Sequence, residues 1–169
     1  MKIRESGMPE RKMWDTFFDP TNLLTKLGFD GKFDDVAEFG CGYGTFTIPA
    51  SKLIQGQIFA LDIDPEMIRI TKEVAQEHNR TNIQVNLRDF MVDGSGLPDK
   101  IDEAKRILKD GGKSGVIHWN YDASTPRGPS MEIRPKSEDC VKWIENAGFQ
   151  LKKAHDLKPY HYGLAFIKQ

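Results

Sequence analysis

Cysteine is almost absent from this chain of 169 residues. The two that occur, Cys41 and Cys140, lie far apart and form no C-x-x-C pair. Disulfide frameworks and structural zinc sites need more cysteines or closer spacing, so we expect neither here, and no metal site. Free thiols of this kind fit a cytoplasmic location, where cysteines stay reduced.

The chain also lacks an excess of either charge. Lys and Arg number 24 against 25 Asp and Glu, which gives a formal net charge of -1. A chain without net positive charge has no global attraction for phosphate backbones or anionic lipid. Nucleic acid is therefore not a favoured partner.

Long apolar runs are missing as well. No stretch of about 18 apolar residues occurs, and residues 1–10 carry charges without an apolar segment. We expect neither a signal peptide nor a membrane span. The length, with 38% hydrophobic residues, predicts one domain over 1–169, made of a helical cap over 1–28 and a core over 34–169.

Strand and helix patterns alternate through the middle of the chain. Strands are expected at 36–39, 57–63, 83–87 and 115–119, and helices at 45–54, 65–78 and 104–108. This order predicts an α/β fold of the Rossmann-like kind, with a doubly wound, mostly parallel sheet and helices on both faces.

The two ends of the chain carry further patterns. Helical spacing of Met13, Trp14, Phe17 and Phe18 and a short segment at 22–27 predict two N-terminal helices. After a long loop at 123–134, Ser137 is expected to cap a helix. Segments 150–157 and 162–167 are expected to pair as an antiparallel hairpin.

Three glycines, Gly40, Gly42 and Gly44, follow the first predicted strand and precede a helix. Glycines in this context let the backbone approach a ligand closely. The spacing differs from the dinucleotide fingerprint, which places its third glycine or an alanine where Thr45 stands. Glu38, inside the apolar strand, would repel a pyrophosphate and attract an ammonium or sulfonium. We therefore expect a ligand that is cationic near this turn.

Two more carboxylates close the next strands. Asp62 ends the second strand, where an acidic residue takes the ribose hydroxyls of a bound nucleoside, and Asp89 ends the third, where it can accept from an exocyclic amine. Ligands of such sheets bind at the carboxyl ends of the strands. Plainer interpretations are a purely structural glycine turn, a helix-flanking Asp62 and a helix cap at Asp64.

In these segments the sequence resembles the class I S-adenosylmethionine-dependent methyltransferases. The resemblance rests on EFGCGYG at 38–44, LDIDPEM at 61–67 and RDF at 88–90, and is closest to the quinone-biosynthesis and arsenite methyltransferase-like branch. It implies S-adenosylmethionine as the cofactor and S-adenosylhomocysteine as the product. The cofactor residues it implies are Glu38, Gly40, Cys41, Gly42, Gly44, Asp62, Ile63, Asp89 and Phe90.

The resemblance also implies how the cofactor lies. Gly40 and Gly42 would line its methionine part, Asp62 would bind ribose, and Asp89 with Phe90 would hold adenine. The arsenite enzymes rely on several cysteines, and this chain has two. A small organic molecule is therefore the expected acceptor.

One strand and one helix of that family are missing from the sequence. Only residues 99–103 lie where about 25 would be needed by average element lengths. Losing a central strand would expose two sheet edges. We therefore favour an interruption at 99–103, where the written sequence omits residues, over a genuine loss of the strand and its helix.

Acceptor-side candidates gather around the strand that ends at residue 119. Methyl transfer is an in-line displacement that depends mainly on positioning, so few catalytic side chains are needed. His118 is the candidate base for a hydroxyl or thiol acceptor, although His118 or Trp119 packed in the sheet is an equal alternative. The candidate substrate contacts are Trp14, Phe17, Trp119, Asn120 and Arg127. Cys41 is better explained as a small filler of the turn than as a nucleophile.

Other functional classes stay open. A non-catalytic S-adenosylmethionine or nucleotide-binding module would keep the glycine turn, and a protein methyltransferase would keep the cofactor site. A nicotinamide oxidoreductase needs room for a pyrophosphate, which Glu38 disfavours. We expect a monomer or a homodimer.

Overall fold

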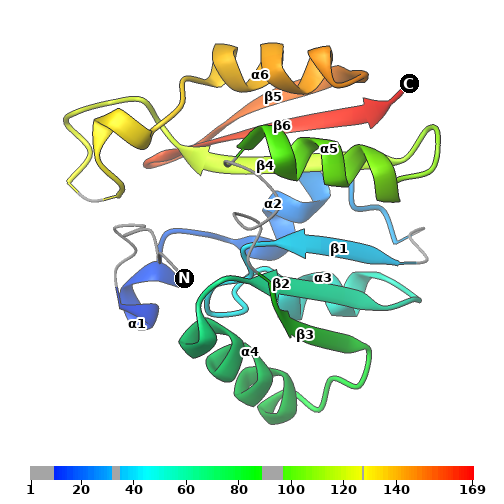
Figure 1. The fold of residues 1–169 in the computed structure, drawn as a ribbon. Coiled ribbons are helices and arrows are strands. Elements are labelled where there is room, and N and C mark those ends of the chain that lie inside the picture. Colours follow the sequence, from blue (N-terminus) through cyan, green and yellow to red (C-terminus); the bar gives the residue numbers. More distant parts are fainter. Residues whose placement is uncertain (1–9, 32–34, 89–96, 127) are drawn as a thin grey trace. The chain divides into compact units, whose positions relative to one another are not determined.

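The computed structural model describes residues 10–31, 35–88, 97–126 and 128–169 (Figure 1). The described residues form two compact units, one drawn from residues 18–88 and one drawn from residues 10–17 and 97–169. The chain passes from one unit to the other between Phe17 and Phe18, inside the expected helical cap. One domain over 1–169 stays a prediction.

The first unit contains a three-stranded parallel sheet. The strands are β1 (Val36–Phe39), β2 (Ile58–Asp62) and β3 (Ile83–Leu87), in the order β1-β2-β3. Its helices are α2 (Pro20–Lys26), α3 (Thr47–Leu53) and α4 (Pro65–Glu77). The expected alternation of parallel strands and helices is confirmed.

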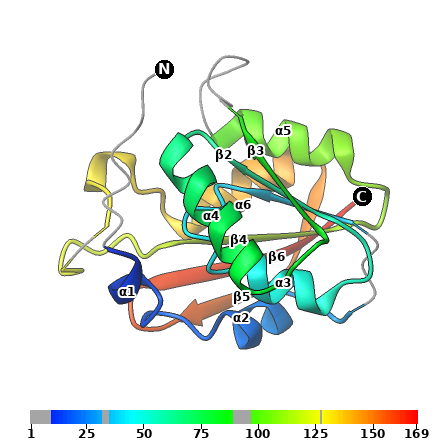
Figure 2. The same ribbon diagram turned by 90° about the horizontal axis from the view of Figure 1, so that it is seen from below.

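The core of this unit forms between the sheet and its helices. Ile58 and Ala60 of β2 are fully buried, and Ile68 of α4 and Ala50 of α3 pack in the same cluster. In Figure 2, seen from below, α4 lies across the parallel strands. Burial of alternate β2 residues in this way predicts that the strand cannot slip without exposing them.

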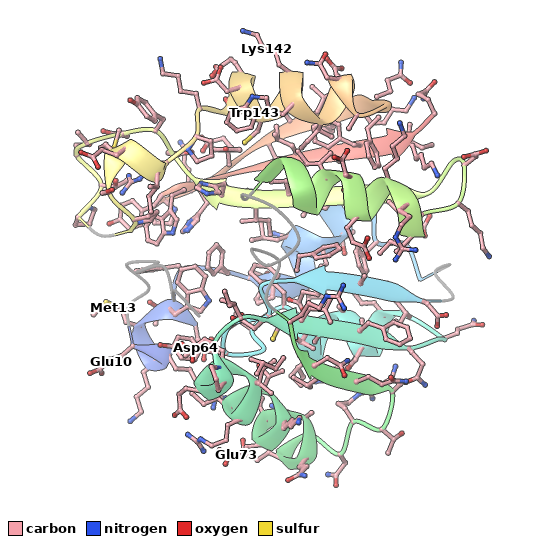
Figure 3. The ribbon with its side chains drawn as sticks, viewed as in Figure 1. Glu10, Met13, Asp64, Glu73, Lys142 and Trp143 are labelled. Carbon is pink, nitrogen blue, oxygen red and sulfur yellow. The ribbon has the colours of Figure 1, made fainter. Side chains whose placement is uncertain are left out.

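The predicted start of α4 is confirmed. Asp64 Oδ1 accepts a hydrogen bond of 2.8 Å from the Glu66 amide, and Pro65 is the first helical residue. Figure 3 shows Asp64 at the N-terminal end of α4. Pro49 likewise lies in the first turn of α3, where no intrahelical donor is lost.

The second unit contains a three-stranded antiparallel sheet. The strands are β4 (Lys113–Trp119), β5 (Phe149–Leu157) and β6 (His161–Lys168), in the order β4-β6-β5. β5 and β6 form the expected C-terminal hairpin. The helices are α1 (Arg11–Trp14), α5 (Leu97–Ile107), the 3₁₀ turn η1 (Met131–Ile133) and α6 (Ser137–Asn146).

The two faces of β6 pack against different elements. Leu164 and Phe166 join Cys140 and Ile144 of α6 in a buried cluster, together with apolar residues of α5. His161, at an odd position of the strand, lies on the opposite face and contacts the rings of Trp119 and Trp14. Helices α5 and α6 thus cover one face, while the aromatic residues near α1 gather on the other.

Three expected boundaries are wrong. α5 begins at Leu97 rather than near Ala104, and α1 ends at Trp14, short of Phe17. Ser137 is the first residue of α6 rather than its cap; the cap is Lys136, which makes no side-chain capping bond.

The expected interruption at residues 99–103 is also wrong. These residues lie inside α5, one continuous helix of 11 residues. Among the described residues, no further strand or helix lies between β3 and α5, and β1 and β4 are each an end strand of their own sheet.

Within the described residues, no helix combines the length and apolar character needed to cross a membrane. The same residues contain no group of three or more His, Cys, Asp or Glu side chains placed to hold a metal ion.

Candidate functional site

The glycine turn between β1 and α3 needs glycine for its backbone conformation. Gly40, Gly42 and Gly44 have φ angles of 83°, 53° and 78°, all in the left-handed region. A side chain at such positions is strained, whereas glycine adopts them at no steric cost. The backbone conformation of this turn therefore requires glycine at all three positions.

Asp62, at the end of β2, holds this turn in place. Its Oδ2 accepts a hydrogen bond of 2.9 Å from the Gly42 amide, and its Oδ1 accepts one of 3.0 Å from the Asp64 amide. Each carboxylate oxygen has a second lone pair and can still accept from a ligand hydroxyl. The helix-flanking role and the ligand role are therefore compatible in the same side chain.

Glu38 lies on β1 two residues before the turn, and its carboxylate is anchored by a buried hydroxyl. The Thr47 hydroxyl donates to Glu38 Oε2 at 2.6 Å, and Thr47 is fully buried on α3. Burial raises the pKa of Glu38 to about 7, the Thr47 hydrogen bond opposes this, and the charge of Asp62 adds to it. A neighbouring cation would relieve that cost and favour the ionised form.

Cys41 is buried inside the turn, and burial, followed by the charge of Glu38, raises the pKa of its thiol to about 12. Reactive cysteines have low pKa values and exposed sulfur. The geometry agrees with Cys41 as a small filler of the turn.

The structure thus brings Glu38, Gly42 and Asp62 together as expected, with Gly40, Cys41 and Gly44 in the same turn and Ile63 directly after β2. Asp89 and Phe90 lie outside the described residues. Sequence patterns missed Thr47 and Thr71, whose buried hydroxyls bond Glu38 and Gly42.

Known proteins that are similar to this chain include methyltransferases, and the similarity includes the glycine turn. Residues 36–95, which carry the turn and Asp62, match the family model described as a methyltransferase domain. A ribosomal protein L11 methyltransferase from Dictyoglomus thermophilum is 31% identical over 126 residues, which are 66% of this chain. The chain spans 39% of the length of that relative.

Solved structures extend the similarity to nearly the whole chain. A SAM-dependent methyltransferase from Aquifex aeolicus has a TM-score of 0.79 at 20% identity, over 94% of this chain and 93% of that one. A putative type 11 methyltransferase from Sulfolobus solfataricus has a TM-score of 0.70 at 25% identity, over 89% and 92%. The fold is that of the S-adenosylmethionine-dependent methyltransferases.

In this methyltransferase fold the acceptor-side candidates lie in the second unit. His118 on β4 is half-buried, its ring stacks on Tyr162 with centroids 6.0 Å apart, and its Nδ1 is 3.3 Å from the Trp119 carbonyl oxygen. Arg127 lies outside the described residues. The roles of these residues toward a substrate stay predictions.

Trp14, Phe17 and Trp119 come together in one aromatic cluster. Trp119 is buried, and its ring centroid lies 6.0 Å from that of Trp14, 6.2 Å from that of Phe17 and 4.3 Å from that of His161. Burial lowers the pKa of His161 to about 4, so this imidazole is neutral at pH 7. The cluster connects the N-terminal segment to the antiparallel sheet of its own unit.

Arg134, at the end of the expected loop over 123–134, has a structural role. It is buried and donates to the backbone carbonyls of Asn120, Asp122 and Pro129. Its guanidinium also lies 5.9 Å from the Trp119 ring centroid. Arg134 therefore holds the loop after β4 in shape.

Asn120 lines a pocket of about 260 Å³ in the second unit. The other lining residues all carry polar groups: Tyr121, Lys136, Ser137, Glu138 and Tyr162. The Lys136 ammonium lies 5.2 Å from the centre of the Tyr121 ring, a cation–π arrangement. The groups that line the pocket are hydroxyls, an amide and charged side chains.

Proposed function

We propose that the chain binds S-adenosylmethionine at the glycine turn and transfers its methyl group to a small organic acceptor. The observation that carries this proposal is the Glu38 carboxylate, held by Thr47 beside the turn with its pKa raised to about 7. Such a group gains most from a cationic ligand and resists a pyrophosphate. The ammonium and sulfonium of S-adenosylmethionine meet that requirement.

Each part of the cofactor has a proposed partner. Gly40 and Gly42 would line the methionine part, and Asp62, which already accepts from the Gly42 amide at 2.9 Å, would accept from ribose. Asp89 and Phe90 would hold adenine. Within the family we propose the quinone-biosynthesis and arsenite methyltransferase-like branch, and the paucity of cysteine supports a cytoplasmic enzyme.

A small organic acceptor is supported by the shortage of cysteine, because the arsenite enzymes that the chain resembles rely on several cysteines and this chain has two. A protein acceptor is the second candidate, because the relative from Dictyoglomus thermophilum is named a ribosomal protein methyltransferase. The net charge of -1 continues to disfavour nucleic acid.

The experiment that separates these acceptors uses S-adenosylmethionine labelled on its methyl group. The protein is incubated with the small-molecule fraction and, separately, with the protein fraction of a cell extract. We expect label to appear in a new small molecule in the first reaction. Transfer to the protein fraction alone would replace the small acceptor with a protein acceptor.

His118→Asn tests the proposed base. If His118 accepts the acceptor proton, the turnover number should fall by about 10²- to 10⁴-fold, because positioned bases contribute that much. S-adenosylmethionine affinity should stay within about twofold, since the cofactor residues lie on other strands. Turnover and calorimetric affinity are measured on the same preparation.

The matched control is His155→Asn, which alters another half-buried strand histidine, on β5. It should leave both quantities near their wild-type values. Equal losses of turnover and cofactor affinity in His118→Asn would show that His118 is a packing residue.

A further inference from the structure

The glycine turn is held from a direction that the sequence does not reveal. Thr71 lies on α4 and is fully buried. Its hydroxyl donates to the Gly42 carbonyl oxygen at 2.8 Å, across 29 positions of sequence. A helical threonine usually bonds the carbonyl of the preceding turn of its own helix, so this bond is directed at the glycine turn instead.

The Thr71 side chain makes two further contacts with the same turn, one through its hydroxyl oxygen and one through its methyl group. Its Oγ1 is 3.7 Å from Cys41 Sγ. A Cβ added at Gly44 would lie 3.4 Å from the Thr71 methyl carbon, so glycine leaves the space in which that methyl packs. One side chain therefore touches three residues of the turn, Cys41, Gly42 and Gly44.

The Gly42 residue is consequently fixed on both sides. Its amide donates to Asp62 Oδ2 at 2.9 Å, and its carbonyl accepts from Thr71 at 2.8 Å. Asp62 comes from the end of β2 and Thr71 from the middle of α4, and both belong to the same unit. A glycine has more backbone freedom than any other residue, so this turn gains the most from outside restraint.

We infer that Thr71 is a positioning residue for cofactor binding, whose hydroxyl holds Gly42 in the orientation that receives the ligand. The inference rests on the proposed cofactor role of the turn. A turn that is ordered before binding avoids the entropy cost of ordering on binding. Loss of the hydroxyl leaves the Gly42 carbonyl without this donor and frees the peptide to rotate.

Two substitutions separate the hydrogen bond from the packing. Thr71→Val keeps the shape and the methyl but removes the hydroxyl, whereas Thr71→Ser keeps the hydroxyl and removes the methyl. We expect Thr71→Val to weaken S-adenosylmethionine binding by about tenfold and Thr71→Ser to stay within about threefold of wild type. Affinity is measured by calorimetry, and folding of each variant by thermal unfolding.

Ser51→Ala is the matched control for a buried hydroxyl in the same unit. Ser51 is fully buried on α3 and donates to the Ile48 carbonyl at 2.8 Å, away from the turn. It should lower the unfolding temperature without changing affinity. If Thr71→Val does not fold, Thr71→Ser and Thr71→Ala give the same comparison, because they differ only by the hydroxyl.

Amide hydrogen exchange at Gly42 supplies a readout that needs no ligand. We expect exchange about tenfold faster in Thr71→Val than in wild type, with no such change in Ser51→Ala. The inference would be overturned if Thr71→Val kept the wild-type affinity for S-adenosylmethionine. It would also be overturned if Thr71→Val and Thr71→Ser lost the same amount of that affinity. Failure of the wild type to bind S-adenosylmethionine would instead overturn the proposed function, and the exchange rates would still decide the role of Thr71.

Discussion

Glu38→Gln is expected to weaken S-adenosylmethionine binding by at least about thirtyfold while making the empty protein more stable. The affinity falls because a neutral amide loses the attraction of a buried carboxylate for a cation, on the order of 2–3 kcal/mol. Gln keeps an oxygen that can accept from the Thr47 hydroxyl, which donates to Glu38 Oε2 at 2.6 Å. The loss is therefore one of charge more than of shape.

The stability gain follows from the raised pKa of Glu38. A carboxyl whose folded pKa is about 7 stabilises the fold fully below its unfolded pKa of about 4.3. That contribution is lost as the pH rises through about 7. At pH 7.5 the neutral Gln should therefore increase the free energy of unfolding by about 1–3 kcal/mol, seen as a higher unfolding temperature.

The same pKa predicts how binding depends on pH. Below about 7 the empty wild-type protein holds a proton on Glu38, which a cationic ligand must displace. Affinity of the wild type should thus rise by about tenfold between pH 6 and 7.5, while Glu38→Gln stays flat. Glu77→Gln, at an exposed glutamate of α4, removes the same charge. It should change neither the affinity for S-adenosylmethionine nor the dependence of that affinity on pH. Unchanged affinity in Glu38→Gln would remove this carboxylate from the cofactor site.

Asp62→Ala is expected to weaken cofactor binding by about 10- to 150-fold, the loss of roughly 1.5–3 kcal/mol from a charged hydrogen bond. It also removes the acceptor for the Gly42 and Asp64 amides, so the unit should be less stable. Asp35→Ala is the matched control. Asp35 accepts a backbone bond of 2.8 Å from Gln57, before the start of β1, and its loss should spare binding.

A double-mutant cycle isolates the ribose contact of Asp62 from its effect on the turn. S-adenosylhomocysteine and its 2′-deoxy and 3′-deoxy analogues are titrated into wild type and Asp62→Asn. If Asp62 accepts from a ribose hydroxyl, loss of that hydroxyl should weaken binding to wild type but weaken Asp62→Asn little further. Additive losses with both analogues would assign Asp62 to the turn alone.

The sequence predicts the part of the site that depends on strand ends. Gly40 to Gly44 follow β1 and Asp62 ends the neighbouring parallel strand β2, and such strand ends meet at one edge of a sheet. The hydroxyls of Thr47 and Thr71 could not be predicted, because a threonine on a helix carries no local mark of a partner 9 or 29 residues away. Their roles depend on how α3 and α4 pack.

The errors in element boundaries have similarly local causes. Gly94, Gly96 and Pro98 indicate a loop, yet Pro98 is the second residue of α5, where proline costs no helical hydrogen bond. The pattern of Trp14 and Phe17 suggests one longer helix, whereas both rings pack around Trp119 through tertiary contacts. Spacing alone does not distinguish these cases, because ring packing depends on residues more than 100 positions away.

The most direct test of the account is a pair of calorimetric titrations of the wild-type protein at pH 7.5, one with S-adenosylmethionine and one with NADH. The carboxylate of Glu38 beside the glycine turn predicts saturable binding of S-adenosylmethionine at one site per chain and no binding of NADH. Binding of NADH with no response to S-adenosylmethionine would contradict the account, because it would show that the turn accepts a pyrophosphate despite Glu38.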